Sequence, residues 1–221
     1  MGKIIADIRL FHSTVENKDG NTLPSNYGNK SLNVILHRVV MKLREQGFTL
    51  GDFDHLYLNF TPCVAEGEIC PAARSVEREF AWFRYYDVGV SEEFAEKQDF
   101  NEIFALIKRV LLLHFPQSSP ETVETAFSSA LAEGENMLMR FKEKRAAKTS
   151  AVIFLRYLDE GKYLPLLCVY DADGKEILRR NLPASSELLQ IGEIALSSKK
   201  VTVKPRKSVF AKDLAPITFE F

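Results

Sequence analysis

The pattern of apolar and polar positions in the first sixty residues predicts a strand, a helix and a second strand. Residues 3–11 alternate loosely and are rich in isoleucine, which is typical of a strand. Between residues 31 and 46, apolar side chains recur every three or four positions, and Gly47 stands where a helix would end. Residues 55–61 then alternate with period two, which predicts a half-buried strand.

The most distinctive segment is 77–90, EREFAWFRYYDVGV, which holds five aromatic residues, including the only tryptophan. If it is a strand, one face carries Phe80, Trp82, Arg84 and Tyr86, and the other carries Ala81, Phe83, Tyr85 and Asp87. One interpretation is a core strand covered on both faces. A second is a protein-recognition surface, because Trp, Tyr and Arg are favoured at binding hot spots. A third is a platform on which nucleic-acid bases stack, although the flanking acidic residues oppose it.

Two further helices follow the aromatic segment. Ser91 and the acidic residues after it predict a helix start, and the apolar stripe that follows reaches Pro116. Ser119, followed by proline, predicts the start of another helix whose apolar stripe extends to Phe141. The basic residues 142–148 suit the negative end of that helix dipole.

From residue 151 the period changes to that of strands. Three strand-like runs cover residues 151–158, 163–170 and 175–180. A short helix is predicted at 185–190, and weaker strands are predicted at 194–203 and 216–221. Short polar gaps between the first three runs predict antiparallel hairpins. The fold class expected from these patterns is α+β, with a mixed or largely antiparallel sheet, about three long amphipathic helices and a C-terminal antiparallel β-meander. We expect one compact domain, 1–221, with two lobes, 1–148 and 149–221.

Charge is balanced overall but segregated along the chain. The 221 residues carry a formal net charge of −1, which argues against a whole-protein basic surface for nucleic acid. Residues 45–73 contain acidic side chains and no lysine or arginine, whereas residues 199–212 contain six basic side chains and no acidic one. These stretches are either solvated faces, or an acidic patch for a basic partner and a basic strip for an anionic one.

The chain lacks features of secretion or membrane insertion. Its N-terminal apolar run is too short for a signal peptide, and no run of about eighteen apolar residues predicts a membrane-spanning helix. Three cysteines do not make a disulfide framework. These features predict a reduced, cytoplasmic setting and no membrane partner.

No motif names a reaction. Cys63 and Cys70 are spaced more widely than a zinc knuckle, so we expect no metal and no cofactor. Asp54, His55 and Cys63 could form a cysteine-nucleophile site, but we favour the simpler interpretation that His55 begins a strand and faces solvent. The segment that begins at Asp171 lacks the closing glutamate of a calcium loop and predicts a hairpin turn.

The function expected by elimination is that of a non-catalytic cytoplasmic protein that binds another, basic protein. A bacterial immunity or antitoxin-type inhibitor is the most concrete version. The candidate binding residues are Asp52, Asp54, Glu66, Glu68, Trp82, Arg84, Tyr85, Tyr86 and Asp87. Two alternatives remain open, namely a cysteine-dependent enzyme that uses Cys63 or Cys70, and a structural subunit of an oligomer.

Overall fold

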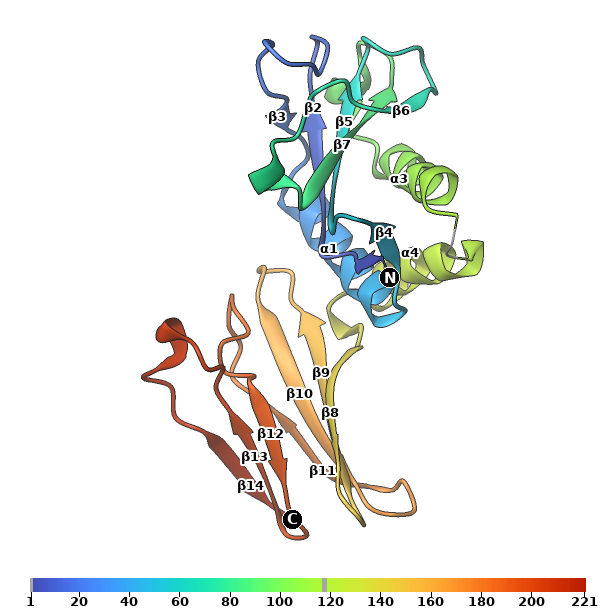
Figure 1. The fold of residues 1–221 in the computed structure, drawn as a ribbon. Helices are drawn as coiled ribbons and strands as arrows, with labels where there is room; N and C mark the ends of the chain where they lie inside the picture. Colours follow the sequence, from blue (N-terminus) through green and yellow to red (C-terminus); the bar gives the residue numbers. More distant parts are fainter. Residues whose placement is uncertain (1, 117–118) are drawn as a thin grey trace. The chain divides into compact units, whose positions relative to one another are not determined.

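The computed structural model describes residues 2–116 and 119–221, which form two compact units, Met1–Gly134 and Glu135–Phe221 (Figure 1). The α+β class is confirmed, with helices confined to the first unit apart from short 3₁₀ turns. The division between the units comes earlier in the chain than the lobe boundary predicted at residue 148.

A five-stranded mixed sheet organises the first unit, in the order β3-β2-β5-β7-β6. Its centre is parallel and consists of β2 (Asp7–His12), β5 (His55–Thr61) and β7 (Phe83–Gly89). The edge strands β3 (Ser25–Asn26) and β6 (Ile69–Pro71) are antiparallel to their neighbours.

The predicted N-terminal strand is divided in two. β1 (Lys3–Ile4) pairs with β4 (Thr49–Gly51) and not with the central sheet. The chain changes neighbours at the next two residues, because the Ile5 amide donates to the Phe48 carbonyl and the Ala6 amide donates to the Asp54 carbonyl.

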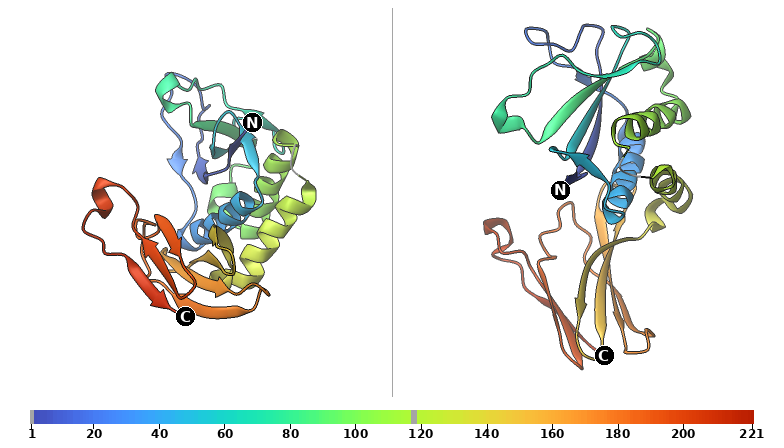
Figure 2. Two further views of the ribbon diagram at one scale, coloured as in Figure 1. Left: turned by 60° about the horizontal axis from the view of Figure 1, so that its bottom comes forward. Right: turned by 45° about the vertical axis from the view of Figure 1, so that its right-hand side comes forward.

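One face of the central sheet is covered by helices, as the right-hand view of Figure 2 shows. The helices are α1 (Lys30–Glu45), α2 (Phe94–Lys97), α3 (Phe100–His114) and α4 (Pro120–Glu133). The first of them connects the parallel strands β2 and β5, as a parallel pair requires. Its ends agree with the sequence, because Asn29 accepts a hydrogen bond from the Leu32 amide (3.0 Å) and Gly47 has a left-handed φ of 75°.

Two helix predictions were wrong at their ends. α3 is capped by Asp99 instead of Ser91, and the chain between them forms only the four-residue α2. α4 stops at Glu133, because Gly134 takes φ 55° and ψ −131°, outside the helical region. The 3₁₀ turn η2 (Gly134–Asn136) follows. Of the apolar residues predicted to extend this helix, Leu138 lies in the link after the turn and Phe141 lies in the next strand.

The second unit consists of two antiparallel sheets, which confirms the predicted meander. Four consecutive strands form the first sheet: β8 (Met139–Arg145), β9 (Ser150–Tyr157), β10 (Tyr163–Tyr170) and β11 (Glu176–Asn181). Three more form the second: β12 (Glu193–Leu196), β13 (Lys200–Lys204) and β14 (Ile217–Glu220). The predicted helix at 185–190 was wrong, because Ser185 bridges to Tyr163 and turns follow it.

Candidate binding face of the parallel sheet

The face of the parallel sheet opposite the helices carries three rows of side chains, each row in register across β2, β5 and β7. From the amino ends of the strands to their carboxyl ends, the rows are Asp7, His55 and Phe83; Arg9, Tyr57 and Tyr85; Phe11, Asn59 and Asp87. No helix among residues 2–116 and 119–134 covers this face (Figure 2). Each row thus places at least one aromatic side chain beside charged or polar ones.

Tyr57 is at the centre of an aromatic cluster on this face. Its ring stacks on Phe83 at a centroid distance of 4.7 Å and lies 5.2 Å from both Phe11 and Tyr85. Tyr57 and Phe11 are buried. Trp82 adds an upper layer, with its ring 4.9 Å from Phe83 and 4.7 Å from His55. The cluster is thus a packed, largely buried base on which Trp82 lies.

The exposed part of the cluster is an aromatic ledge formed by Phe80, Trp82 and Phe83. Phe80 is 44% exposed and Trp82 is 37% exposed, while Phe83 is half-buried. The ledge arises because the 3₁₀ turn η1 (Arg78–Phe80) and a following turn precede β7. The strand alternation therefore begins only at Phe83, and Trp82 lies on the same side as its neighbour.

This turn corrects the expected facing of the aromatic segment, in which Trp82 shared a side with Arg84 and Tyr86. Those two residues point to the helix-covered face. The Arg84 guanidinium lies 5.5 Å from the Phe53 ring centroid, and the Tyr86 ring lies 4.7 Å from that of His114. Tyr85 remains on the open face, half-buried beside Tyr57.

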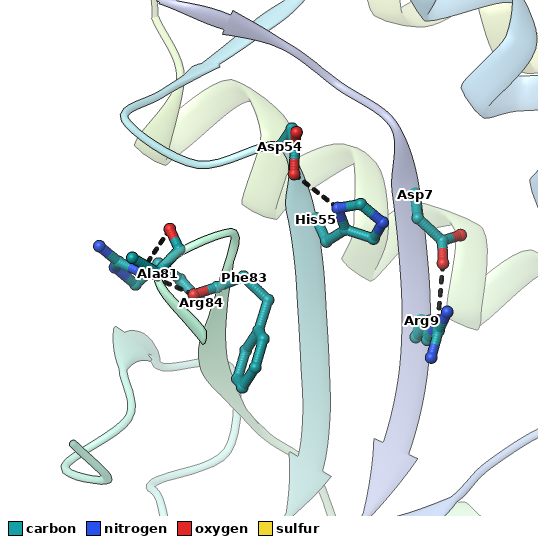
Figure 3. A network of polar contacts seen from close by, with 7 residues as sticks. All are labelled: Asp7, Arg9, Asp54, His55, Ala81, Phe83 and Arg84. Atoms are coloured by element: carbon teal, nitrogen blue, oxygen red, sulfur yellow. Dashed lines mark hydrogen bonds and ion pairs between the residues drawn. The ribbon is translucent and has the colours of Figure 1, made fainter. Parts of the chain in front are cut away.

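Polar contacts lie beside Phe83, as Figure 3 shows for the two neighbouring strands. Asp54 Oδ1 lies 2.6 Å from His55 Nδ1, and Asp7 accepts a 2.7 Å hydrogen bond from Arg9 Nε. The Arg9 guanidinium also lies 5.5 Å from the Tyr57 ring centroid, in cation–π geometry. On the helix-covered face, to which Arg84 points, its guanidinium pairs with Asp52 at 2.9 Å.

The carboxyl ends of the parallel strands carry a buried polar network. Asp87 is 6% exposed and accepts hydrogen bonds from the side-chain amides of Asn59 (2.8 Å) and Asn17 (3.3 Å). The same Asn59 amide donates to Ser13 Oγ at 3.1 Å. Arg74 Nε in turn donates to Asn17 Oδ1 at 2.8 Å. The network thus fastens two loops over this end of the sheet.

Burial raises the pKa of Asp87, although the amides of Asn59 and Asn17 and the charge of Arg74 partly oppose the shift. A buried carboxylate held by amides is costly to leave without partners. Asp87 therefore stabilises the fold at the carboxyl ends of the strands, and it is not part of the aromatic ledge.

The candidate acidic residues do not form one patch. Asp52 and Asp54 lie beside the amino end of β5, near the ledge, whereas Glu66 and Glu68 lie in the loop that follows its carboxyl end. The seven-residue strand between them spans roughly 20 Å. Two exposed acids that were not among the candidates, Glu77 and Glu79, flank and enter η1 beside Phe80.

The predicted binding residues omit three residues of this face, namely Arg9, His55 and Phe80. Arg9 and His55 become neighbours of the ledge only through the parallel register of β2, β5 and β7. Asn59 could have indicated the buried polar network from the sequence. It is a polar residue inside a largely apolar strand, and buried polar groups need hydrogen-bond partners.

The cysteine-nucleophile arrangement is not assembled. His55 begins β5, and Cys63 lies beyond its other end, so the strand separates them by roughly 20 Å. Cys70 is on β6, and burial, together with the nearby carboxylates Asp87 and Glu68, raises its thiol pKa. A raised pKa leaves less thiolate at neutral pH, which is the opposite of what an activated nucleophile needs.

We expect Cys63 to react faster than Cys70 with iodoacetamide at neutral pH. Cys63 is exposed, whereas Cys70 is half-buried and its raised pKa keeps it protonated. The labelling rate of Cys70 should increase only well above pH ~8.5, the ordinary thiol value. Mass spectrometry of single-cysteine variants over a pH series measures both rates. Fast labelling of Cys70 below that pH would contradict the assignment.

In the described ranges 2–116 and 119–221, no three His, Cys, Asp or Glu residues are grouped as a metal site would require. No helix within the same ranges has the length and apolar character needed to cross a membrane. Comparison of the chain with protein-family models, curated proteins and solved structures gives no significant match.

Proposed function

We propose that this protein is a non-catalytic binding protein whose protein partner docks on the aromatic ledge of the first unit. One observation carries the proposal: Trp82 and Phe80 are exposed on a sheet face without a helical cover, above a buried aromatic base. Rigid aromatic side chains of this kind give large contact areas at a small cost in conformational entropy. The neighbouring Arg9 adds the third residue type that is enriched at binding hot spots.

Charge supports a basic partner. The first unit contains 13 Lys and Arg against 19 Asp and Glu, a formal net charge of −6. Asp54, Glu77 and Glu79 are acidic residues near the ledge along the chain and the sheet, whereas Asp52 pairs with Arg84 on the other face. The same field repels a phosphate backbone, so it disfavours nucleic acid even though the aromatic side chains could stack on bases. A basic protein surface satisfies both the charge and the aromatic ledge.

The most concrete version is a cytoplasmic immunity or antitoxin-type inhibitor that masks a basic toxin. Affinity purification from the native host, with the intact chain as bait, tests it. We expect a basic protein encoded by a neighbouring gene, whose toxic activity is lost in the complex. Recovery of an acidic partner, or of a partner that stays fully active in the complex, would contradict this version.

Neutralising the two acids beside the ledge should slow association with the purified partner. The double variant Glu77→Gln with Glu79→Gln removes two exposed charges next to Phe80, so we expect the association rate at low salt to fall by about threefold to tenfold. The dissociation rate should change little, because exposed charges mainly steer the encounter. Stopped-flow kinetics over a salt series measures both rates.

The matched control is Glu66→Gln with Glu68→Gln, which removes the same charge at the far end of the sheet. Screening limits steering to roughly 10 Å at ordinary salt, so this pair should have the smaller effect. Equal slowing by both pairs would show that only the net charge matters and that the ledge is not where the partner arrives.

A further inference from the structure

The connection between β13 and β14 in the second unit carries an exposed apolar tip. Its 3₁₀ turn, η3 (Val209–Ala211), leaves Val209 74% exposed and Phe210 80% exposed. These are the highest exposed fractions among the large apolar side chains of residues 2–116 and 119–221. Two adjacent apolar side chains this exposed are unfavourable in water, and such exposure commonly marks an interaction site.

Hydrogen bonds order the loop that carries the apolar tip. The Ala211 amide donates to the Ser208 carbonyl, and the Leu214 amide donates to the Ala211 carbonyl, both at 3.1 Å. Ala211 itself is buried and anchors the turn. Farther along, Gln190 Nε2 donates to the Ala215 carbonyl at 2.9 Å. These contacts position the backbone of the turn that carries the two apolar side chains.

A basic hollow of about 680 Å³ lies at the start of the same loop. Four cationic side chains line it: Lys142, Lys204, Arg206 and Lys207. Glu193 is the one carboxylate among its lining residues, and it lies 3.5 Å from Lys204. Another cation, Lys212, directly follows η3. Because Lys204 is near Glu193 and Asp213 follows Lys212, the positive charge beside the apolar tip comes mainly from Arg206 and Lys207.

Close backbone packing shapes the wall of the hollow. The Gly192 amide donates to the Lys204 carbonyl at 2.7 Å, and the Arg206 amide donates to the Leu189 carbonyl at 2.8 Å. A Cβ atom on Gly192 would lie 2.1 Å from the Pro205 carbonyl oxygen, so only glycine fits this approach. Lys142, from the other sheet of this unit, donates to the Gly192 carbonyl. These backbone contacts therefore define the positions from which the cationic side chains extend.

We propose that this loop binds the surface of an anionic lipid bilayer, with headgroup phosphates at the basic hollow and Phe210 and Val209 inserted at the interface. The second unit as a whole carries 16 Lys and Arg against 11 Asp and Glu, a formal net charge of +5. A bilayer interface accepts protruding apolar side chains without a matching pocket, and its acidic headgroups attract the cations around them. A nucleic acid would use the cations but leave Phe210 and Val209 in water. The apolar tip therefore favours lipid over a soluble polyanion.

Vesicle flotation with the full chain tests the proposal without knowledge of any protein partner. We expect binding to vesicles of phosphatidylcholine with about 30% phosphatidylserine and little binding to phosphatidylcholine alone. Binding should weaken as salt rises, because the cations act through a screened field. Phe210→Ala should lower the partition coefficient about tenfold, and Arg206→Gln with Lys207→Gln should lower it about thirtyfold.

Matched controls lie on another hairpin of the same unit. Lys175→Gln removes an exposed charge, and Ile177→Ala removes a 40% exposed apolar side chain, both away from the loop in sequence. Neither control should change flotation by more than about twofold. No binding to acidic vesicles, equal binding to both vesicle types, or equal losses from the controls would overturn the proposal. Heparin binding that Phe210→Ala leaves unchanged, without flotation, would assign the hollow to a soluble polyanion and overturn it as well.

Discussion

Trp82→Ala should weaken binding of the protein partner by about a hundredfold, the loss expected when a central tryptophan anchor is removed. Trp82 is the largest exposed side chain of the aromatic ledge, and it rests on Phe83 and His55 at centroid distances below 5 Å. Because that base remains when the indole is removed, the fold should be retained. Isothermal titration calorimetry with the purified partner measures the affinity, and circular dichroism with urea denaturation checks the fold.

Leu113→Ala is the matched control for this substitution. Leu113 is a 58% exposed apolar residue on α3, so it lies on the helical side of the same unit. The control should leave the affinity within about threefold of wild type, because a residue outside the interface contributes little. If Leu113→Ala lowered the affinity as much as Trp82→Ala does, the ledge would not be the binding surface.

Asp87→Ala should lower the free energy of unfolding by about 3 kcal/mol, the size of effect seen when buried charged hydrogen bonds lose one partner. The substitution leaves the side-chain amides of Asn59 and Asn17 without their shared acceptor in a buried site. It also weakens the hold of Arg74 on the loop that contains Asn17. Urea denaturation measures the change. A loss below about 1 kcal/mol would show that the network does not fasten this end of the sheet.

Asp87→Asn separates the charge of this residue from its shape. Burial raises the pKa of Asp87 in the folded state, so the folded protein holds the proton more tightly than the unfolded chain does. The contribution of the group to stability is therefore complete below its ordinary pKa of about 4 and is lost as the pH rises through the raised value. Wild type should gain stability relative to Asp87→Asn as the pH falls from 7 towards 4. A difference that stays constant or reverses would contradict the direction of the shift.

Much of the local structure of this protein follows from sequence periodicity. The helix over α1, its end at Gly47 and the strand over β5 match the predicted positions, and so do the hairpins of the second unit. These elements depend on side chains near one another in sequence, and each is bounded by recognisable capping or turn residues. The failure at α4 is instructive, because the apolar residues after Gly134 continue the helical spacing. The neighbouring residues Met139, Arg140 and Lys142 pair with β9, and a periodic pattern does not contain that pairing.

The candidate site was only partly accessible from the sequence. Trp82 was among the predicted binding residues, but its segment was first interpreted as a strand covered on both faces; instead Trp82 is 37% exposed, and the turn before β7 shifts it to the opposite side from the predicted one. Asn17 and Arg74 reach Asp87 only because two loops fold over the carboxyl end of the sheet. Such long-range hydrogen bonds leave no trace in local spacing. The parallel register that places Arg9 beside Tyr57 is likewise a property of the tertiary fold.

Photo-crosslinking inside the native host tests most directly whether the aromatic ledge is the docking surface. p-Benzoylphenylalanine replaces Phe80 in one variant and Leu113 in the other, so both probes occupy exposed apolar positions on opposite sides of the first unit. We expect a discrete crosslinked product with a basic protein from position 80, lost when Trp82→Ala is added, and none from position 113. A crosslink only from position 113, or equal crosslinks from both positions, would contradict it.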